Sequence, residues 1–169
     1  PHVVKVLEKV IPKFDRVIEI GTGRGAFSFW ISQTKREDAD FYTYDISGDR
    51  FEFQDAKLNF TVADCFESDA IAAIQTLIQE PSKRVLLMCD GGNKEREMNV
   101  FSKFLKPNDV AMCHDYSESA LDYNKHKAEH QWPTNSESHL KNLELAGMSK
   151  FEEHYHELKN VFWGAFVKN

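Results

Sequence analysis

The chain has 169 residues, of which 41% are hydrophobic and 28% are charged, a composition typical of a globular domain in water. No apolar run approaches the roughly 20 residues that a membrane span requires, so we expect no membrane partner. The net charge is −6 and the longest basic cluster is Lys35-Arg36, which argues against nucleic acid as a partner.

Cysteine usage indicates a reducing compartment. Cys65, Cys89 and Cys113 are far apart and show no C-x-x-C spacing, which disfavours a disulfide framework or a zinc ribbon. We therefore expect buried free thiols and a cytoplasmic protein. The sequence begins with Pro1 rather than Met, which fits a chain truncated at its N-terminus. The oligomeric state stays open.

The first half of the chain predicts strands that alternate with helices. Residues 3–10 show helical spacing that Pro12 closes, and a strand follows at 16–20. A helix with Phe27, Trp30 and Ile31 on one face is expected next. Further strands are expected at 40–45 and 58–64, with only a short helix between them.

The second half continues this alternation. Helices are predicted at 69–79 and 93–105, each followed by a strand, at 84–90 and 109–115. Residues 116–137 lack a clear period and are interpreted as a loop or partly helical lid. A helix around 139–145 and a hairpin of strands at 151–158 and 161–167 complete the expected order. The chain is thus predicted to be one α/β domain over residues 1–169, with a mostly parallel seven-stranded sheet, an antiparallel C-terminal hairpin and helices on both faces.

A glycine-rich turn joins the first strand to the following helix. Gly21, Gly23 and Gly25 can adopt positive φ and lack a Cβ, so the main chain can pass close to a ligand at a helix N-terminus. Gly21-x-Gly23-x-x-Ala26 also satisfies the dinucleotide fingerprint. The turn alone therefore leaves the type of cofactor open.

Acidic residues occur at the carboxyl ends of successive predicted strands. They are Glu19, Asp45, Asp64, Asp90 and Asp115. Ligands of open parallel sheets bind at that edge, so we expect these acids to converge. Asp45 is placed to accept hydrogen bonds from both ribose hydroxyls, and Asp64 to accept one from an adenine amino group. Glu19 is placed to meet an ammonium group directly or through water. A cationic sulfonium with an amino-acid tail suits this cleft better than a pyrophosphate.

Three segments and the C-terminal hairpin together carry a family resemblance. Residues 18–25 (IEIGTGRG), 44–46 (YDI) and 63–65 (ADC) resemble the class I S-adenosylmethionine-dependent methyltransferases over nearly the whole chain. The resemblance implies a Rossmann-like three-layer sandwich and S-adenosylmethionine as cofactor. Its expected ligands are Glu19, Gly21, Thr22, Gly23, Gly25, Asp45, Ile46, Asp64, Cys65 and Asp90.

Two further segments narrow the resemblance. Residues 86–93 (LLMCDGGN) and 105–116 (LKPNDVAMCHDY) are similar to the macrolide-sugar O-methyltransferase and cephalosporin-hydroxylase-like branch. This branch implies Mg²⁺ or another divalent metal held by Asp90 and Asp115, with His114 as a further ligand. His114 is a softer ligand than magnesium prefers. Asn93 stands where the sugar methyltransferases have a histidine suited to be the general base, so His114, Asn93 and Lys94 are the catalytic candidates.

These residues predict an enzyme that methylates the oxygen of a small hydroxylated acceptor with divalent-metal assistance. The sequence 90–93 (DGGN) lacks the Asn-Pro-Pro-Tyr type of motif of base-modifying enzymes, which argues against DNA N-methylation. Acceptor specificity is expected in residues 116–137. Two alternatives remain: a cofactor-binding protein without transfer chemistry, which the Asn93 substitution suggests, and an NAD-dependent oxidoreductase in which Asp45 holds the ribose.

Overall fold

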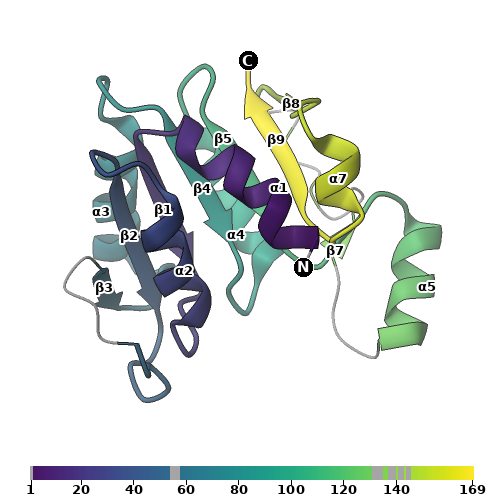
Figure 1. Cartoon of the computed structure of the whole chain (residues 1–169), viewed down its shortest axis with the longest axis horizontal. Coiled ribbons are helices and arrows are strands. Elements are labelled where there is room, and N and C mark those ends of the chain that lie inside the picture. Colours follow the sequence, from purple (N-terminus) through teal and green to yellow (C-terminus); the bar gives the residue numbers. More distant parts are fainter. Residues whose placement is uncertain (1, 54–57, 131–134, 137–139, 141–142, 144–145) are drawn as a thin grey trace.

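A twisted central sheet organises the computed structural model, which describes residues 2–53, 58–130, 135–136, 140, 143 and 146–169 (Figure 1). Within these residues the sheet has seven strands in the order β3-β2-β1-β4-β5-β9-β8. The strands are β1 (Arg16–Ile20), β2 (Asp40–Asp45), β3 (Asn59–Val62), β4 (Val85–Cys89), β5 (Val110–Cys113), β8 (Met148–Lys150) and β9 (Gly164–Lys168). The first five run parallel, and β9 is antiparallel to both β5 and β8, as predicted.

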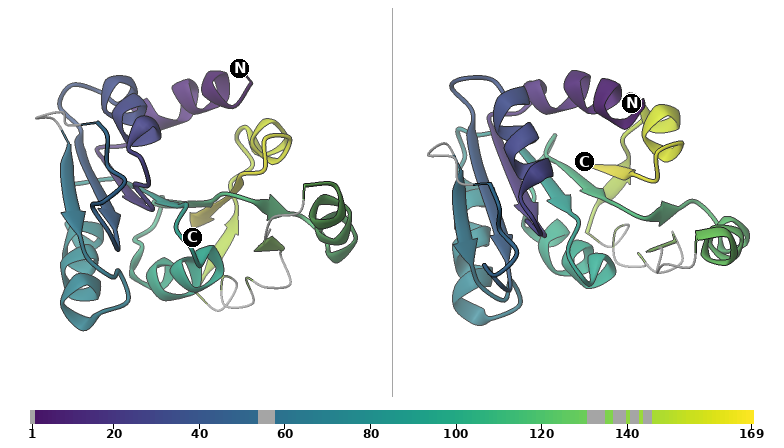
Figure 2. Two further views of the ribbon diagram at one scale, coloured as in Figure 1. Left: turned by 90° about the horizontal axis from the view of Figure 1, so that it is seen from below. Right: turned by 60° about the horizontal axis from the view of Figure 1, so that its bottom comes forward.

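Helices cover both faces of the sheet (Figure 2). One face carries α1 (His2–Val10), α2 (Ala26–Thr34) and α7 (Tyr155–Lys159), and the other carries α3 (Ser68–Gln79) and α4 (Lys94–Phe101). Short 3₁₀ helices, η1 (Ile11–Lys13) and η2 (Ser102–Phe104), follow α1 and α4. This arrangement is the predicted three-layer sandwich.

Alternate residues of the central strands enter two separate cores. Val17 packs in the cluster with Leu7 and Ile31, whereas its neighbour Ile18 packs in the cluster with Ile74 and Phe101. All residues of β1 and β4 are buried, as expected for parallel strands covered on both faces. Cys65, Cys89 and Cys113 are buried and free, as predicted.

Strand register brings the ends of the parallel strands level. Ile20 is paired with both Tyr44 and Cys89, and Cys89 is paired with Cys113. The residues that follow these strands therefore lie along one edge of the sheet. The strand order reverses between β1 and β4, the position at which ligands bind in open α/β sheets.

The predicted bounds of the C-terminal hairpin were wrong, although its antiparallel pairing was correct. The first hairpin strand is Met148–Lys150 rather than 151–158, and residues Tyr155–Lys159 form helix α7. Tyr155 and Leu158, three residues apart, are buried on one face of this helix. His154, which precedes α7, has a positive φ of 64°, which breaks the extended conformation before the helix.

The region expected as a lid is partly helical. It contains β6 (Tyr116–Ser117), α5 (Ala120–His130) and β7 (Asn135–Ser136), and β6 pairs in parallel with β7. Helix α5 stands away from the sheet and its helices (Figures 1 and 2), and Leu121 on it is 80% exposed. The lid function stays a prediction.

Two smaller predictions fall partly outside the described residues. Residues 46–53 form no helix between β2 and β3, and 54–57 are not described. Of the helix predicted around 139–145, only residues 140 and 143 are described, and Leu140 and Leu143 are both buried. None of the helices in the described ranges combines the length and apolar character needed to cross a membrane.

Candidate functional site

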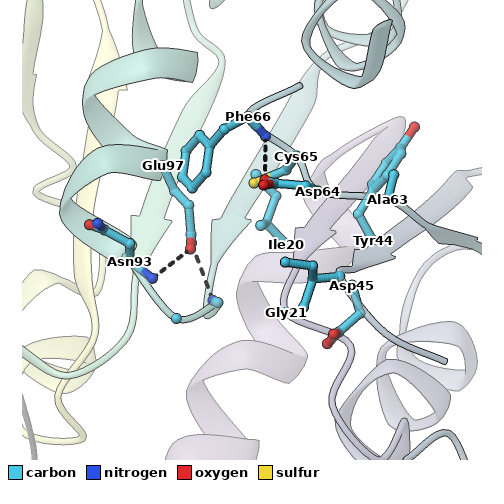
Figure 3. Close-up of a pocket in the computed structure, with 13 residues that line it drawn as sticks. Ile20, Gly21, Tyr44, Asp45, Ala63, Asp64, Cys65, Phe66, Asn93 and Glu97 are labelled. Atoms are coloured by element: carbon cyan, nitrogen blue, oxygen red, sulfur yellow. Dashed lines mark hydrogen bonds between the residues drawn. The ribbon is translucent and has the colours of Figure 1, made fainter. Parts of the chain in front are cut away.

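A cavity of about 240 Å³ lies at the carboxyl ends of β1, β2, β3 and β4 (Figure 3). Five of the expected cofactor ligands line it: Gly21, Asp45, Ile46, Asp64 and Cys65. The other described lining residues are Ile20, Tyr44, Ala63, Phe66, Gly91, Gly92, Asn93 and Glu97. Of the five acids at the strand ends, Asp45 and Asp64 are among the described residues that line the cavity.

Backbone hydrogen bonds fasten the glycine turn to β2. The N–H groups of Gly21 and Thr22 donate to the carbonyl of Tyr44 at 2.8 and 3.2 Å, and the N–H of Gly23 donates to Asp45 Oδ2 at 2.7 Å. Gly21 has a φ of 105°, and a Cβ there would lie 2.4 Å from the Asp90 carbonyl oxygen. Only glycine fits this contact between the turn and the end of β4.

The acids of the cavity wall also shape their own loops. Asp45 Oδ1 accepts from the N–H of Ser47 at 3.2 Å, and Asp64 Oδ1 accepts from the N–H of Phe66 at 2.9 Å. A carboxylate offers about four acceptor positions, so each keeps capacity for a ligand. Ile46, next to Asp45, is 72% exposed and gives the cavity an apolar rim.

The structure places Glu19 beneath the turn, fully buried, and not among the described residues that line the cavity. Its Oε2 accepts hydrogen bonds from Ser28 Oγ and, at 2.6 Å, from Thr43 Oγ1. Its Oε1 is buried with no hydrogen-bond partner among the described residues. Burial raises the pKa of Glu19 to about 7, against the lowering effect of these hydroxyl groups. Thr22, bonded through its hydroxyl to Thr43 at 2.5 Å, belongs to this same buried network.

Glu97 is a cavity residue that the sequence analysis missed. Its carboxylate accepts from the N–H groups of Gly91 at 3.2 Å and Asn93 at 3.1 Å, so it holds the loop after β4 (Figure 3). Burial raises the pKa of Glu97 to about 7. The signal in the sequence was an acid one helical turn after an Asn that begins a helix, a spacing close to that of a capping box.

Asn93 caps helix α4. Its side-chain oxygen accepts from the N–H of Arg96 at 3.0 Å, while its own N–H donates to Glu97. The residue that stands at the position of the expected base is therefore engaged in starting the helix.

A charged cluster adjoins the cavity beyond the 91–93 loop. Asp90, His114 and Asp115 each offer a ligand atom, and these atoms lie within 4.8 Å of one another. His114 Nδ1 is 3.1 Å from Asp90 Oδ1 and 3.6 Å from Asp115 Oδ1. Asp115 has a positive φ of 56°, which Asp tolerates better than most residues. The residues expected as metal ligands are thus together, and two carboxylates with an imidazole suit a divalent ion.

Lys94 lies in the same cluster. Its Nζ is 3.1 Å from Asp115 Oδ2 and 3.6 Å from Asp90 Oδ1, and it donates to the Gly91 carbonyl at 2.9 Å. Burial lowers the pKa of Lys94, but the charges of Asp90 and Asp115 outweigh this effect and raise the pKa above its ordinary value. Lys94 is therefore held as a cation, which opposes a role as proton acceptor.

An aromatic wall positions His114. The centroid of its ring lies 4.8 Å from that of Trp163, which is buried, and Phe27 lies behind Trp163 at 6.0 Å. The imidazole is thus held between a carboxylate and a fixed ring face, at the edge of the site.

Comparison with solved structures identifies the fold. A CmcI structure containing Mg and SAM has a TM-score of 0.67 at 12% identity, over 100% of this chain and 72% of that chain. An O-methyltransferase family protein from Burkholderia thailandensis has a TM-score of 0.59 at 10% identity, over 97% of this chain and 54% of that chain. The MycE methyltransferase from the mycinamycin biosynthetic pathway, in complex with Mg and SAH, has a TM-score of 0.51 at 16% identity, over 68% of this chain and 31% of that chain.

At the level of sequence, no family model matches the chain, and a search of curated proteins gave no match. The structural likeness nevertheless shows that the chain shares the fold of these proteins, a Rossmann-like α/β sandwich with an antiparallel C-terminal hairpin, as the alternation of strands and helices predicted.

Proposed function

We propose that the chain is an S-adenosylmethionine-dependent methyltransferase that methylates a hydroxyl group of a small acceptor. One juxtaposition carries the proposal: the cavity with Asp45 and Asp64 on its wall adjoins, through the 91–93 loop, the cluster of Asp90, His114 and Asp115. A cofactor pocket and a group able to take a proton are thereby side by side. The solved CmcI structure with Mg and SAM supports the assignment.

The cavity residues fit the parts of the cofactor. Asp45 would accept from the ribose hydroxyls and Asp64 from the adenine amino group, because each carboxylate retains free acceptor positions. Ile46 would cover one face of the purine. Glu19 would not touch the cofactor but would hold the glycine turn in place from below, through its hydrogen bond with Thr43, whose hydroxyl also contacts that of Thr22.

His114 is the proposed general base. In methyl transfer, the acceptor oxygen attacks the methyl carbon, the carbon–sulfur bond breaks with its electron pair going to sulfur, and the acceptor proton passes to His114. Asp90 and Trp163 hold the imidazole for this step. A small acceptor, rather than nucleic acid, fits the net charge of −6.

A divalent metal would be held by Asp90, Asp115 and His114. When bound, it would lower the pKa of an acceptor hydroxyl and orient it. His114 would then be engaged as a ligand, so metal assistance and the base role of His114 are competing versions of the mechanism.

A second candidate function is cofactor binding without methyl transfer. The observation that favours it is Asn93, which caps α4 where the sugar methyltransferases have a histidine.

Calorimetry tests the cofactor assignment. We expect S-adenosylhomocysteine to bind and NAD to give no heat, and Asp45→Ala and Asp64→Ala each to weaken binding about tenfold or more, because each removes a charge-assisted hydrogen bond. Asp69→Asn, an exposed acid in the first turn of α3, is the matched control. Binding of NAD without S-adenosylhomocysteine would reject the proposal.

Transfer of labelled methyl groups to a panel of small hydroxylated acceptors tests the chemistry. His114→Gln should lower turnover by about 10² to 10⁴ while S-adenosylhomocysteine affinity stays unchanged. Cofactor binding with no transfer to any acceptor would favour the second candidate.

A further inference from the structure

The centre of the acidic cluster already contains a cation from the chain itself. Lys94 Nζ bridges the two carboxylates, at 3.1 Å from Asp115 and 3.6 Å from Asp90. These are the same carboxylates that would hold a divalent metal.

The ammonium group is held there by the surrounding structure. Lys94 is the first residue of α4, immediately after the capping Asn93, and its Nζ also donates to the Gly91 carbonyl. Glu97 fixes the same loop through the N–H groups of Gly91 and Asn93. Lys94 thus reaches the acids from a short, anchored segment.

The three charged side chains are shielded from water. The side chain of Lys94 is 15% exposed, and those of Asp90 and Asp115 are 25% and 19% exposed. Charges that are largely out of water are weakly screened, so a second cation placed among these groups would be repelled by the ammonium unless the lysine moved away.

We propose that the Lys94 ammonium and a divalent metal are alternative occupants of one cation site, so that Lys94 sets how tightly this protein binds metal. When no metal is bound, the Lys94 ammonium is the cationic partner of the Asp90 and Asp115 carboxylates. When a metal enters, it has to displace Lys94 from both acids. The inference rests on the proposed function only through the location of the metal site, and methyl transfer itself plays no part in it.

Binding of Mn²⁺, measured by electron paramagnetic resonance and calorimetry on the whole chain, tests this competition. We expect Lys94→Met to bind Mn²⁺ at least about tenfold more tightly than the wild type, because the competing charge is gone, and Lys94→Arg to bind it as weakly as the wild type. Asp115→Asn added to Lys94→Met should remove the tight binding. Lys103→Met, at an exposed lysine of η2, is the control and should match the wild type.

Two results would overturn the proposal: equal Mn²⁺ affinity in the wild type and Lys94→Met, or no Mn²⁺ binding to either protein. Circular dichroism shows whether Lys94→Met folds like the wild type. If it does not, Lys94→Gln is used in its place. Titration of the same samples with S-adenosylhomocysteine reports separately on the proposed function, since loss of cofactor binding with intact metal competition would reject only that function.

Discussion

Gly91 and Glu97 fit together so closely that a Cβ on Gly91 would lie 2.3 Å from Glu97 Oε1. The same oxygen accepts the hydrogen bond from the Asn93 N–H. The contact therefore links the loop after β4 to the first turns of α4, between the cavity and the charged cluster.

Gly91→Ala should destabilise the protein by about 1–3 kcal/mol, because the buried carboxylate has to move and lose loop hydrogen bonds. Urea unfolding gives the free energy of unfolding. Gly92→Ala is the matched control, since a Cβ at Gly92 meets nothing within 4 Å. Equal stability of the two variants would contradict this account of the loop.

Gly21→Ala should be more damaging than Gly23→Ala. At Gly21 the added Cβ would lie 2.4 Å from a backbone oxygen at a φ of 105°, whereas at Gly23, with a φ of 55°, it would meet nothing within 4 Å. We expect Gly23→Ala to cost about 1–2 kcal/mol and Gly21→Ala to cost more and also weaken S-adenosylhomocysteine binding. Thermal unfolding and calorimetry measure both effects, and the opposite ranking would refute the prediction.

The buried Glu19 should make stability fall as the pH rises. Its pKa is about 7 in the folded chain and close to 4.5 when unfolded, so between these values the folded state binds the proton more tightly. Glu19 should lower the free energy of unfolding by an amount on the order of 1–3 kcal/mol between pH 4.5 and pH 7. The Glu19→Gln variant should lack this contribution to the decrease. Urea unfolding at pH 5 and pH 7.5 measures it. Glu67→Gln, at an exposed position, should keep the wild-type pH dependence.

Glu118 should tie the start of the predicted lid to the C-terminal elements. It forms an ion pair with Lys159 and, at 3.1 Å, with Lys150, and hydrogen bonds to Lys159 and Lys150 lower its pKa to about 2. Its contribution to stability is therefore present above pH 4.5 and lost as the pH falls towards 2.

Glu118→Gln should cost about 1 kcal/mol, because the carboxylate is partly exposed, and should speed amide exchange in residues 116–130. Hydrogen exchange at pH 7 measures the effect. Glu37→Gln, at another exposed position, is the control. Unchanged exchange in Glu118→Gln would show that the ion pairs do not anchor the segment.

The sequence predicted the fold because its main features are periodic or local. Burial on both faces makes residues 85–89 a continuous apolar run, and the acids that follow the strands converge once the strands are parallel. The predicted bounds of the hairpin were wrong because the local sequence of residues 155–159 (YHELK) does not by itself distinguish a strand from a short helix. Their helix depends on the burial of Tyr155 and Leu158 against the rest of the chain.

The placement of Glu19, which the sequence analysis named, and of Glu97, which it missed, depends on tertiary contacts. Glu19 has the position of a ligand in sequence, but the hydroxyls of Ser28 and Thr43 bind it beneath the turn. Glu97 enters the site because the 91–93 loop folds back over it. The spacing of residues along the chain does not reveal the burial of Glu19. The spacing of Asn93 and Glu97 indicates their contact only once α4 is known to begin after Asn93.

The reversal of strand order between β1 and β4 separates two kinds of task. The ends of β1, β2 and β3 supply the glycine turn, Asp45 and Asp64, whereas β4 and β5 are followed by Asp90, Lys94, His114 and Asp115. Residues 91–93 and Glu97 close the cavity from the β4 side. Under the proposed function, substitutions in the second group would alter the chemistry offered to an acceptor while the first group is left intact. A fold divided in this way would allow the reaction to change around an unchanged cofactor pocket.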